Sequence, residues 1–313
     1  MNNLDKFMNQ EEANELHEFV KQSITNEDNL GVQANELHIV TVVTESKYYF
    51  PYLVESCKKY GKKLTVLGYG EKWLGFTWRF KLMLDYLENL PKSDIVCFID
   101  GYDVICLRDL SELKTEFIKI RNQTNCKIIV GHDKIDRSTL YYNYNYYFNY
   151  YYFGPCYKNI FINAGTYIGY VDDLLYILKK LYNETVENFD DDQVLLIQYC
   201  KKNTDELYID IHNKLFLTIN KIKSEIDDLV EIKNNELFYN NIRPFFIHGP
   251  GKTSLTNILI KLNYNLIELE THKKTPEANI KTTYKRLMSK NFYLHITLLI
   301  IIIAIIVYYL WCK

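Results

Sequence analysis

Short apolar runs alternate with segments of helical period along most of the chain. The β-branched run 37–44 predicts a buried strand, and shorter runs predict strands at 63–67, 94–99 and 127–130. Apolar residues at helical spacing predict helices at 48–60, 78–90, 172–183 and 190–200. A last short strand is predicted at 245–247, ending at His248. This alternation is typical of an α/β domain with a mostly parallel, doubly wound sheet flanked by helices.

The two ends of the chain differ from this middle. Residues 1–35 are polar, with a short helix predicted at 9–24, and residues 36–267 form the expected folded domain. A basic stalk at 268–291 leads to the apolar segment 292–311. Twenty residues at helical rise cover about 30 Å, the hydrocarbon thickness of a bilayer. We therefore expect one C-terminal transmembrane helix, with a buried core helix or strand as the alternative.

Charge and cysteine content suggest where the domain resides. Basic residues precede the apolar segment and only Lys313 follows it, so the positive-inside rule predicts a membrane-anchored protein with a cytosolic catalytic domain. The formal net charge of -2 argues against nucleic acid as a partner. Seven cysteines without a close pair argue against a disulfide framework or a zinc ribbon, and favour reduced thiols. No secretory signal is expected at the N-terminus.

Two carboxylates follow the predicted strand 94–99. Asp100 would leave the strand, and Asp103 would return across a tight turn at Gly101. Ligands on doubly wound sheets bind beyond the carboxyl ends of strands, and paired oxygen ligands suit Mg²⁺ or Mn²⁺. The alternative is a turn aspartate followed by a helix-capping aspartate.

Three further segments carry candidate chemistry. Asp190, Asp191 and Asp192 open an apolar helix, where they could cap it or hold a reacting sugar or an acceptor hydroxyl. The segment 247–254 invites a phosphate-loop reading, but Phe246 stands where that motif needs glycine. His248 could instead complete a metal site, with Lys252 reaching a phosphate. The tyrosine-rich tract 141–153 is either a glycan-stacking lid or an idle expansion.

Taken together and in order, these segments resemble one family. The chain is similar to the glycosyltransferase domain of procollagen lysyl hydroxylases and the related collagen-type glycosyltransferases, including giant-virus relatives. The resemblance runs from about Leu37 to Tyr264. It rests on the segments 42–45 (VVTE), 68–73 (GYGEKW), Lys81, 98–105 (FIDGYDVI), 163–169 (NAGTYIG), 190–193 (DDDQ), 210–212 (DIH) and 248–251 (HGPG).

The resemblance implies a GT-A-like fold that uses Mn²⁺ and a UDP-sugar. It assigns the metal to Asp100, Asp103 and His248. It also implies that Asp191 and Asp192 lie near the transferred sugar and the acceptor, a hydroxyl such as that of hydroxylysine or a glycan. The donor would be held by Thr44, Trp73, Lys81, Tyr102, Gly251 and Lys252.

The chain departs from the family pattern at several positions. The family's asparagine after His-Gly is Pro250 here, and its later lysine falls on Ser254, although Lys252 could substitute. The acceptor loop is replaced by 132–134 and the tyrosine-rich tract. The leading prediction is a hexosyltransferase moving glucose or galactose. The alternatives are a membrane-anchored, non-catalytic binding protein on a degenerate GT-A fold and, disfavoured by Phe246, a nucleotide hydrolase.

Overall fold

A mostly parallel sheet with helices on both faces forms the domain, as the alternation of apolar runs predicts. The computed structural model describes residues 35–133, 147, 150, 154–185, 191–220, 229–251, 253–266 and 290–311. The predicted helix 9–24, most of the tyrosine-rich tract, the stalk up to residue 289, Asp190 and Lys252 lie outside these residues. Two units are distinguished, one of residues 1–134 with 155–271 and the other of 135–154 with 272–313, and the sheet belongs to the first.

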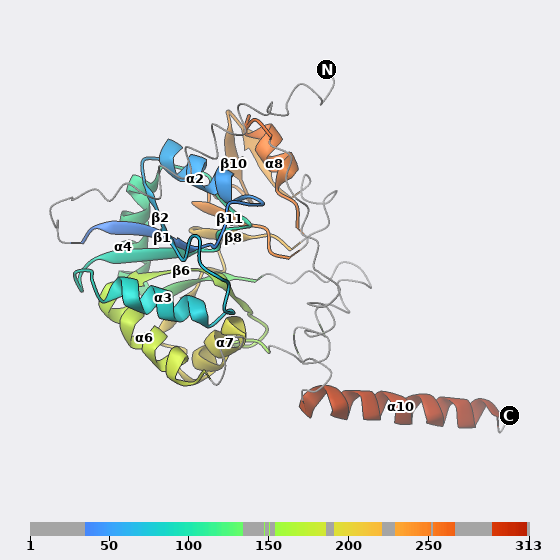
Figure 1. Cartoon of the computed structure of the whole chain (residues 1–313). Coiled ribbons are helices and arrows are strands. Elements are labelled where there is room, and N and C mark those ends of the chain that lie inside the picture. Colours follow the sequence, from blue (N-terminus) through green and yellow to red (C-terminus); the bar gives the residue numbers. More distant parts are fainter. Residues whose placement is uncertain are drawn as a thin grey trace, which may run out of the picture. The chain divides into compact units, whose positions relative to one another are not determined.

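The main sheet has six strands in the order β2-β1-β3-β6-β5-β7 (Figure 1). Four of them confirm predicted strands: β1 (Leu37–Val42), β2 (Leu64–Leu67), β3 (Ile95–Ile99) and β5 (Ile128–His132). The sequence reading missed β7 (Leu207–Ile209) and β6 (Ile162–Tyr170). β6 runs antiparallel to both β3 and β5, and the other neighbouring pairs are parallel. The sheet is therefore mostly parallel, with one reversed strand next to β3.

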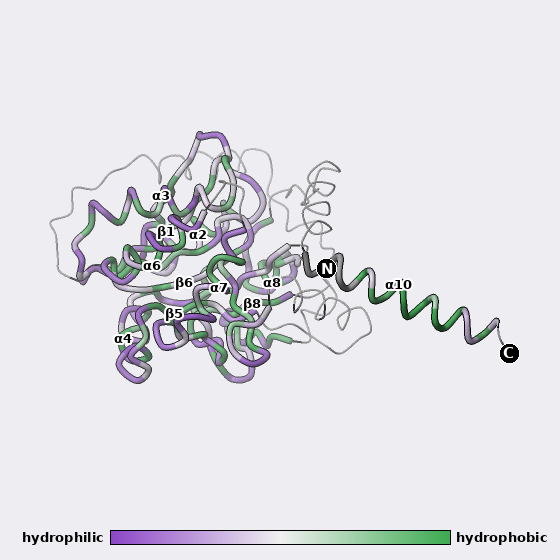
Figure 2. Tube along the Cα trace, turned by 90° about the horizontal axis from the view of Figure 1, so that it is seen from below, coloured by the Kyte–Doolittle hydropathy of each residue, from purple (hydrophilic) through white to green (hydrophobic). Residues whose placement is uncertain are grey.

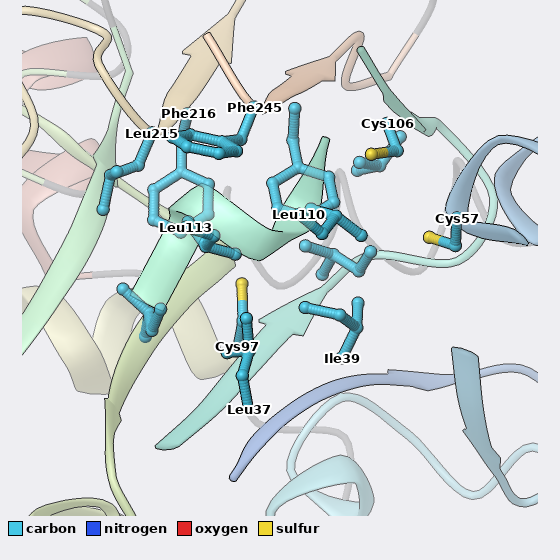
Figure 3. Close-up of a cluster of buried hydrophobic side chains, with 14 of the residues drawn as sticks. Leu37, Ile39, Cys57, Cys97, Cys106, Leu110, Leu113, Leu215, Phe216 and Phe245 are labelled. Atoms are coloured by element: carbon cyan, nitrogen blue, oxygen red, sulfur yellow. The ribbon is translucent and has the colours of Figure 1, made fainter. Parts of the chain in front are cut away.

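Helices cover both faces of this sheet. The predicted helices form as α2 (Phe50–Lys59), α3 (Trp78–Leu87), α6 (Val171–Asn183) and α7 (Asp192–Lys202), and α4 (Leu113–Thr124) was not predicted. α3, α6 and α7 pack on one face (Figure 1). α2 and α4 pack on the other, over the core cluster that Figure 3 shows. Alternate residues of β1 and β3 point to this second face, as the two-residue period of a strand requires: Leu37, Ile39, Ile95, Cys97 and Ile99.

A separate sheet of three strands begins just after β3 in the chain. β4 (Val104–Cys106) pairs antiparallel with β11 (Phe246–His248), and β11 pairs parallel with β8 (Phe216–Thr218). A hairpin of β9 (Glu231–Lys233) and β10 (Glu236–Phe238), together with α8 (Thr256–Lys261), adds a second apolar cluster. β11 confirms the strand predicted to end at His248. The small sheet joins two segments more than 140 residues apart, because β11 returns beside β4.

The cysteine prediction was wrong for one pair. Cys156, before β6, and Cys200, in α7, form a disulfide, with Cα atoms 5.5 Å apart. Their 44-residue separation has no sequence signature, so only the fold shows that α7 ends beside the segment that enters β6. Four other cysteines are free and buried: Cys57, Cys97, Cys106 and Cys126.

The apolar C-terminal segment forms helix α10 (Lys290–Trp311), which is coloured as largely hydrophobic in Figure 2. Its large apolar side chains from Leu298 to Trp311 are exposed. In the part of the chain that the structure describes, no helix combines the length and the apolarity needed to cross a membrane. The predicted transmembrane helix is therefore not confirmed.

Candidate metal centre and acidic site

Two connections bring the candidate metal ligands together. Asp100 follows β3, and Asp103 precedes β4 after a turn at Gly101. A Cβ on Gly101 would come within 2.0 Å of Val43 Cγ1, so the turn packs too closely against β1 for any larger residue. β11 pairs with β4 so that His248 lies opposite Val104, and Gly249 N donates to Asp103 O at 2.9 Å. Asp100 and Asp103 thus meet a histidine from a strand 145 residues further along the chain.

The three side chains converge on one point. His248 Nε2 lies 3.1 Å from Asp103 Oδ1 and 3.7 Å from Asp100 Oδ2. One ligand atom from each residue lies within 4.8 Å of the other two. Asp103 Oδ1 and both ring nitrogens of His248 are buried, and apart from the close approach of Nε2 to Asp103 Oδ1 they make no contact of hydrogen-bond geometry with the described residues. Buried polar atoms normally have partners, so this set of donors fits a divalent cation.

The charge around His248 agrees with a cation-binding site. Burial alone would lower the pKa of His248, but Asp103 and then Asp100 and Asp133 outweigh it and hold that pKa above its ordinary value. The carboxylates therefore create a negative potential strong enough to favour a proton on a buried imidazole. The same potential would favour a metal ion in its place.

Because Gly165 of β6 has no side chain, the strand leaves room for Asp100 and His248. A Cβ at this position would lie 2.5 Å from both Asp100 Oδ2 and His248 Cε1. Gly165 O also accepts a hydrogen bond from Asp100 N at 2.8 Å, which fixes the strand beside the carboxylate. The reversed strand therefore forms one wall of the site, and it does so only because residue 165 lacks a side chain.

The acid cluster at the start of α7 divides into two roles. Asp191 is the N-cap, and its carboxylate accepts from Gln193 N at 3.1 Å and Val194 N at 3.4 Å. Asp192 is buried and forms an ion pair with Arg79 of α3, whose other terminal nitrogen binds Asp100. Burial raises the pKa of Asp192 to about 6, although Arg79 acts to lower it. Asp191 thus caps the helix, whereas Asp192, whose Oδ1 also accepts from Gln193 N at 3.0 Å, directs its Oδ2 to Arg79 beside the metal triad.

The residues predicted to hold uridine lie around the end of β1. The Tyr102 hydroxyl accepts from Thr44 N at 3.0 Å, and Gly70 N donates to Thr44 O at 2.9 Å. These bonds place the turn after β2 beside Thr44 and Tyr102. Trp73, half-buried in the same loop, packs edge-on against Phe76 and Trp78. The structure thus brings Thr44 and Tyr102 into contact and places Trp73 in the loop that begins next to them.

Two of the predicted phosphate-binding residues, Lys81 and Gly251, lie on different elements. Lys81 lies on the exposed side of α3, where its ammonium pairs with Asp85 one helical turn later at 3.0 Å. Gly251 occupies a turn with φ +70, after the strand that carries His248. Arg79, two residues before Lys81, is the α3 cation that enters the site.

Sequence reasoning did not assign two charged residues to this site, although it placed Asp133 in the segment that replaces the acceptor loop. Arg79 has no motif of its own, and the helical period would have placed it on a different face from Lys81. Asp133 follows β5, and burial raises the pKa of its carboxyl to about 6, while His248 and Asn220 act to lower it. Both residues are buried and charged, which is the usual mark of a functional site, but burial is not visible in the sequence.

The model of the PLOD GT domain family matches residues 33–273. The chain belongs to the PLOD GT domain family. This match covers the sheet, the triad and the acid cluster, and it confirms the family resemblance drawn from the ordered motifs.

Several proteins are similar to this PLOD GT domain. A "multifunctional procollagen lysine hydroxylase and glycosyltransferase" of Caenorhabditis elegans is 26% identical over 69% of this chain and 30% of its own. Human "procollagen-lysine,2-oxoglutarate 5-dioxygenase 2" is 25% identical over 75% of this chain and 32% of its own. An uncharacterized protein of Acanthamoeba polyphaga mimivirus is 25% identical over 62% of this chain and 41% of its own. This chain thus spans less than half the length of each of these relatives.

A solved structure is also similar to the PLOD GT domain. It is described as a glycosyltransferase involved in the glycosylation of the major capsid of PBCV-1. The two are 15% identical, with a TM-score of 0.43 over 70% of this chain and 96% of that one.

Proposed function

We propose that this chain is a Mn²⁺-dependent glycosyltransferase that moves a hexose, glucose or galactose, from a UDP-sugar to an acceptor hydroxyl on a protein or glycan. The observation that carries the proposal is the convergence of Asp100, Asp103 and His248, one possible ligand atom of each lying within 4.8 Å of the others. Membership of the PLOD GT domain family supports transferase chemistry at this triad. One relative is itself named as a glycosyltransferase.

Each group of residues has a separate task in this proposal. Asp100, Asp103 and His248 would hold the metal ion, which, when bound, supplies positive charge to the diphosphate of the donor. Thr44, Tyr102 and Trp73 would hold the uridine end of the donor, with Gly251 and Lys252 near its phosphates. Asp192 would position the transferred sugar or the acceptor hydroxyl from the opposite side, because its carboxyl enters the site through Arg79. Asp191 would assist mainly by fixing the start of α7.

Asp103→Asn is the sharpest test of the metal assignment. Asp103 Oδ1 is buried and, apart from the close approach of His248 Nε2, makes no contact of hydrogen-bond geometry with the residues described, whereas Asp100 is also needed to pair with Arg79. We expect Asp103→Asn to abolish Mn²⁺-dependent UDP binding, measured by calorimetry with and without Mn²⁺, and to leave the melting temperature nearly unchanged. The matched control is Asp109→Asn, which changes an exposed helix-capping aspartate where asparagine caps equally well. Unchanged UDP affinity in Asp103→Asn would refute the metal assignment.

Turnover separates the transferase from a non-catalytic binding protein. With Mn²⁺ present, the transferase is expected to release UDP from UDP-glucose or UDP-galactose as it transfers the hexose to an acceptor hydroxyl or, slowly, to water. Metal-dependent UDP binding without any release from either sugar nucleotide, across a panel of protein and glycan acceptors, would favour the binding protein instead.

A further inference from the structure

Arg79 connects the metal triad with Asp192 at the start of α7, although it is not itself a candidate metal ligand. One terminal nitrogen of its guanidinium binds Asp100 Oδ1 and the other binds Asp192 Oδ2. Asp100 therefore uses one oxygen for Arg79 and directs the other, Oδ2, toward His248 at 3.7 Å. The orientation of a candidate metal ligand is thus set by a residue of α3.

The guanidinium is itself held in place. Arg79 is 8% exposed, and the central carbon of its guanidinium lies 5.6 Å from the ring centre of Phe76 and 5.7 Å from that of Phe98. Phe98 stacks in turn on Tyr167 of β6, with ring centres 4.8 Å apart. Rings at this distance favour a cation and restrict the plane of the guanidinium. The aromatic residues therefore fix the direction from which Arg79 reaches both carboxylates.

We propose that Arg79 is a positioning residue that aligns the Asp100 carboxylate for the metal ion and links that alignment to Asp192 at the start of α7. The proposal rests on the metal site of the proposed function and extends it to a residue outside the triad. Partners of this kind, which orient a metal ligand from behind, typically change metal affinity by about 10- to 100-fold when mutated. Arginine suits the task because its planar fork binds two carboxylates at fixed angles, whereas lysine presents a single point charge.

Arg79→Lys tests the proposal because it keeps the positive charge and removes the fork. Any repulsion between residue 79 and the metal ion stays nearly constant, so a change in affinity reports orientation. We expect the dissociation constant for Mn²⁺, measured by calorimetry without nucleotide, to rise by about 10-fold or more. The matched control is Arg121→Lys, since Arg121 also pairs with an aspartate, Asp173, and lies over the ring of Tyr170. Arg121→Lys should leave the Mn²⁺ affinity within about twofold of the original.

A double-mutant cycle with Asp192→Asn separates alignment from simple charge. Asp192→Asn should weaken Mn²⁺ binding in the original chain, because it releases one end of the Arg79 fork. In the Arg79→Lys background it should have little further effect, because the link is already lost. An equal effect in both backgrounds would show that Asp192 acts only through its charge and would overturn the proposal.

The outcomes distinguish this proposal from the function on which it rests. If the original chain binds no Mn²⁺, the metal site itself fails. If it binds Mn²⁺ and Arg79→Lys binds it equally well, the metal site stands and the role of Arg79 is refuted. If Arg79→Lys does not fold, a folded Asp192→Phe variant, which removes one partner of the Arg79 fork, serves as the test. Loss of Mn²⁺ affinity in that variant would support the role of Arg79, and retained affinity would refute it.

Discussion

Gly165→Ala tests whether the reversed strand β6 shapes the metal site. The new Cβ would lie 2.5 Å from Asp100 Oδ2 and His248 Cε1, while ordinary contacts begin at 3.4 Å. Two candidate ligands would therefore have to retreat by roughly 0.9 Å. Metal-ligand distances tolerate changes of only about 0.2 Å. The backbone of Gly165 is not left-handed, so the obstacle to alanine is steric: these two contacts and a third, 2.9 Å to Asn163 Oδ1.

The expected loss is one of metal affinity more than of folding. Adding one methyl group to a packed interior costs about 1–3 kcal/mol of unfolding free energy. Misplacing two of the three ligands should lower Mn²⁺ affinity by at least the 10- to 100-fold typical when ligand orientation is disturbed. The assay is Mn²⁺ titration by calorimetry, followed by UDP affinity at saturating Mn²⁺ and thermal unfolding of the same samples.

Gly169→Ala is a matched control on the same strand. A Cβ at Gly169 would lie 2.8 Å from Ile128 Cγ2 and 3.2 Å from Leu174 Cγ, so it strains the core without touching the triad. We expect this variant to lose a similar amount of stability and to keep its Mn²⁺ affinity per folded molecule. Original Mn²⁺ affinity in Gly165→Ala, or an equal loss of affinity in Gly169→Ala, would refute the reasoning.

Three more predictions follow from the fold and the site. At saturating Mn²⁺, Asp192→Asn should leave UDP affinity in place and lower sugar transfer by about 10²- to 10³-fold, whereas Asp191→Asn should preserve both the cap and most turnover. Full turnover of UDP-glucose and UDP-galactose at saturating Mn²⁺ in both variants would return the cluster to a capping role. Cys156→Ser should lower the unfolding free energy by up to about 4 kcal/mol, because the disulfide closes a long loop, and denaturant melts with and without a reducing agent check this. Removing residues 290–313 should leave the unfolding free energy and the Mn²⁺ affinity of the α/β domain unchanged, because its described apolar clusters draw their members from Leu37 to Leu266; loss of UDP binding on truncation would contradict this.

The order of the motifs and the periodicity of apolar residues predicted much of the fold. The apolar runs at β1, β2, β3 and β5 and the helical spacing of α2, α3 and α6 are local properties, because burial on a strand or a helix face requires a fixed period. β6 was missed because a strand with two glycines and a small alanine has little β propensity. The glycines of β6 allow neighbouring groups to approach the strand closely. A prediction from residue propensities registers them only as a low tendency to form a strand.

The complete triad could be predicted from the sequence only through the pattern of family motifs. Asp100 and Asp103 lie on one turn, so their proximity is a local consequence of β3 and Gly101. His248 joins them because β11 pairs with β4, a long-range pairing that hydrophobic period alone does not specify. The family's motif order supplied that link, and the geometry of the two strands gives its physical reason.

Tertiary structure alone decided which charges serve the site. In the sequence, Lys81 and Arg79 are two cations on one helix, and Asp191 and Asp192 are two acids at the start of another. Helical geometry directs residues two positions apart to different faces, so packing of α3 against the sheet buries Arg79 and exposes Lys81. The position of α7 then gives Asp191 to the cap and Asp192 to Arg79. The sequence by itself determined the residue types and their local periods, and burial, which depends on every neighbouring element, determined their partners.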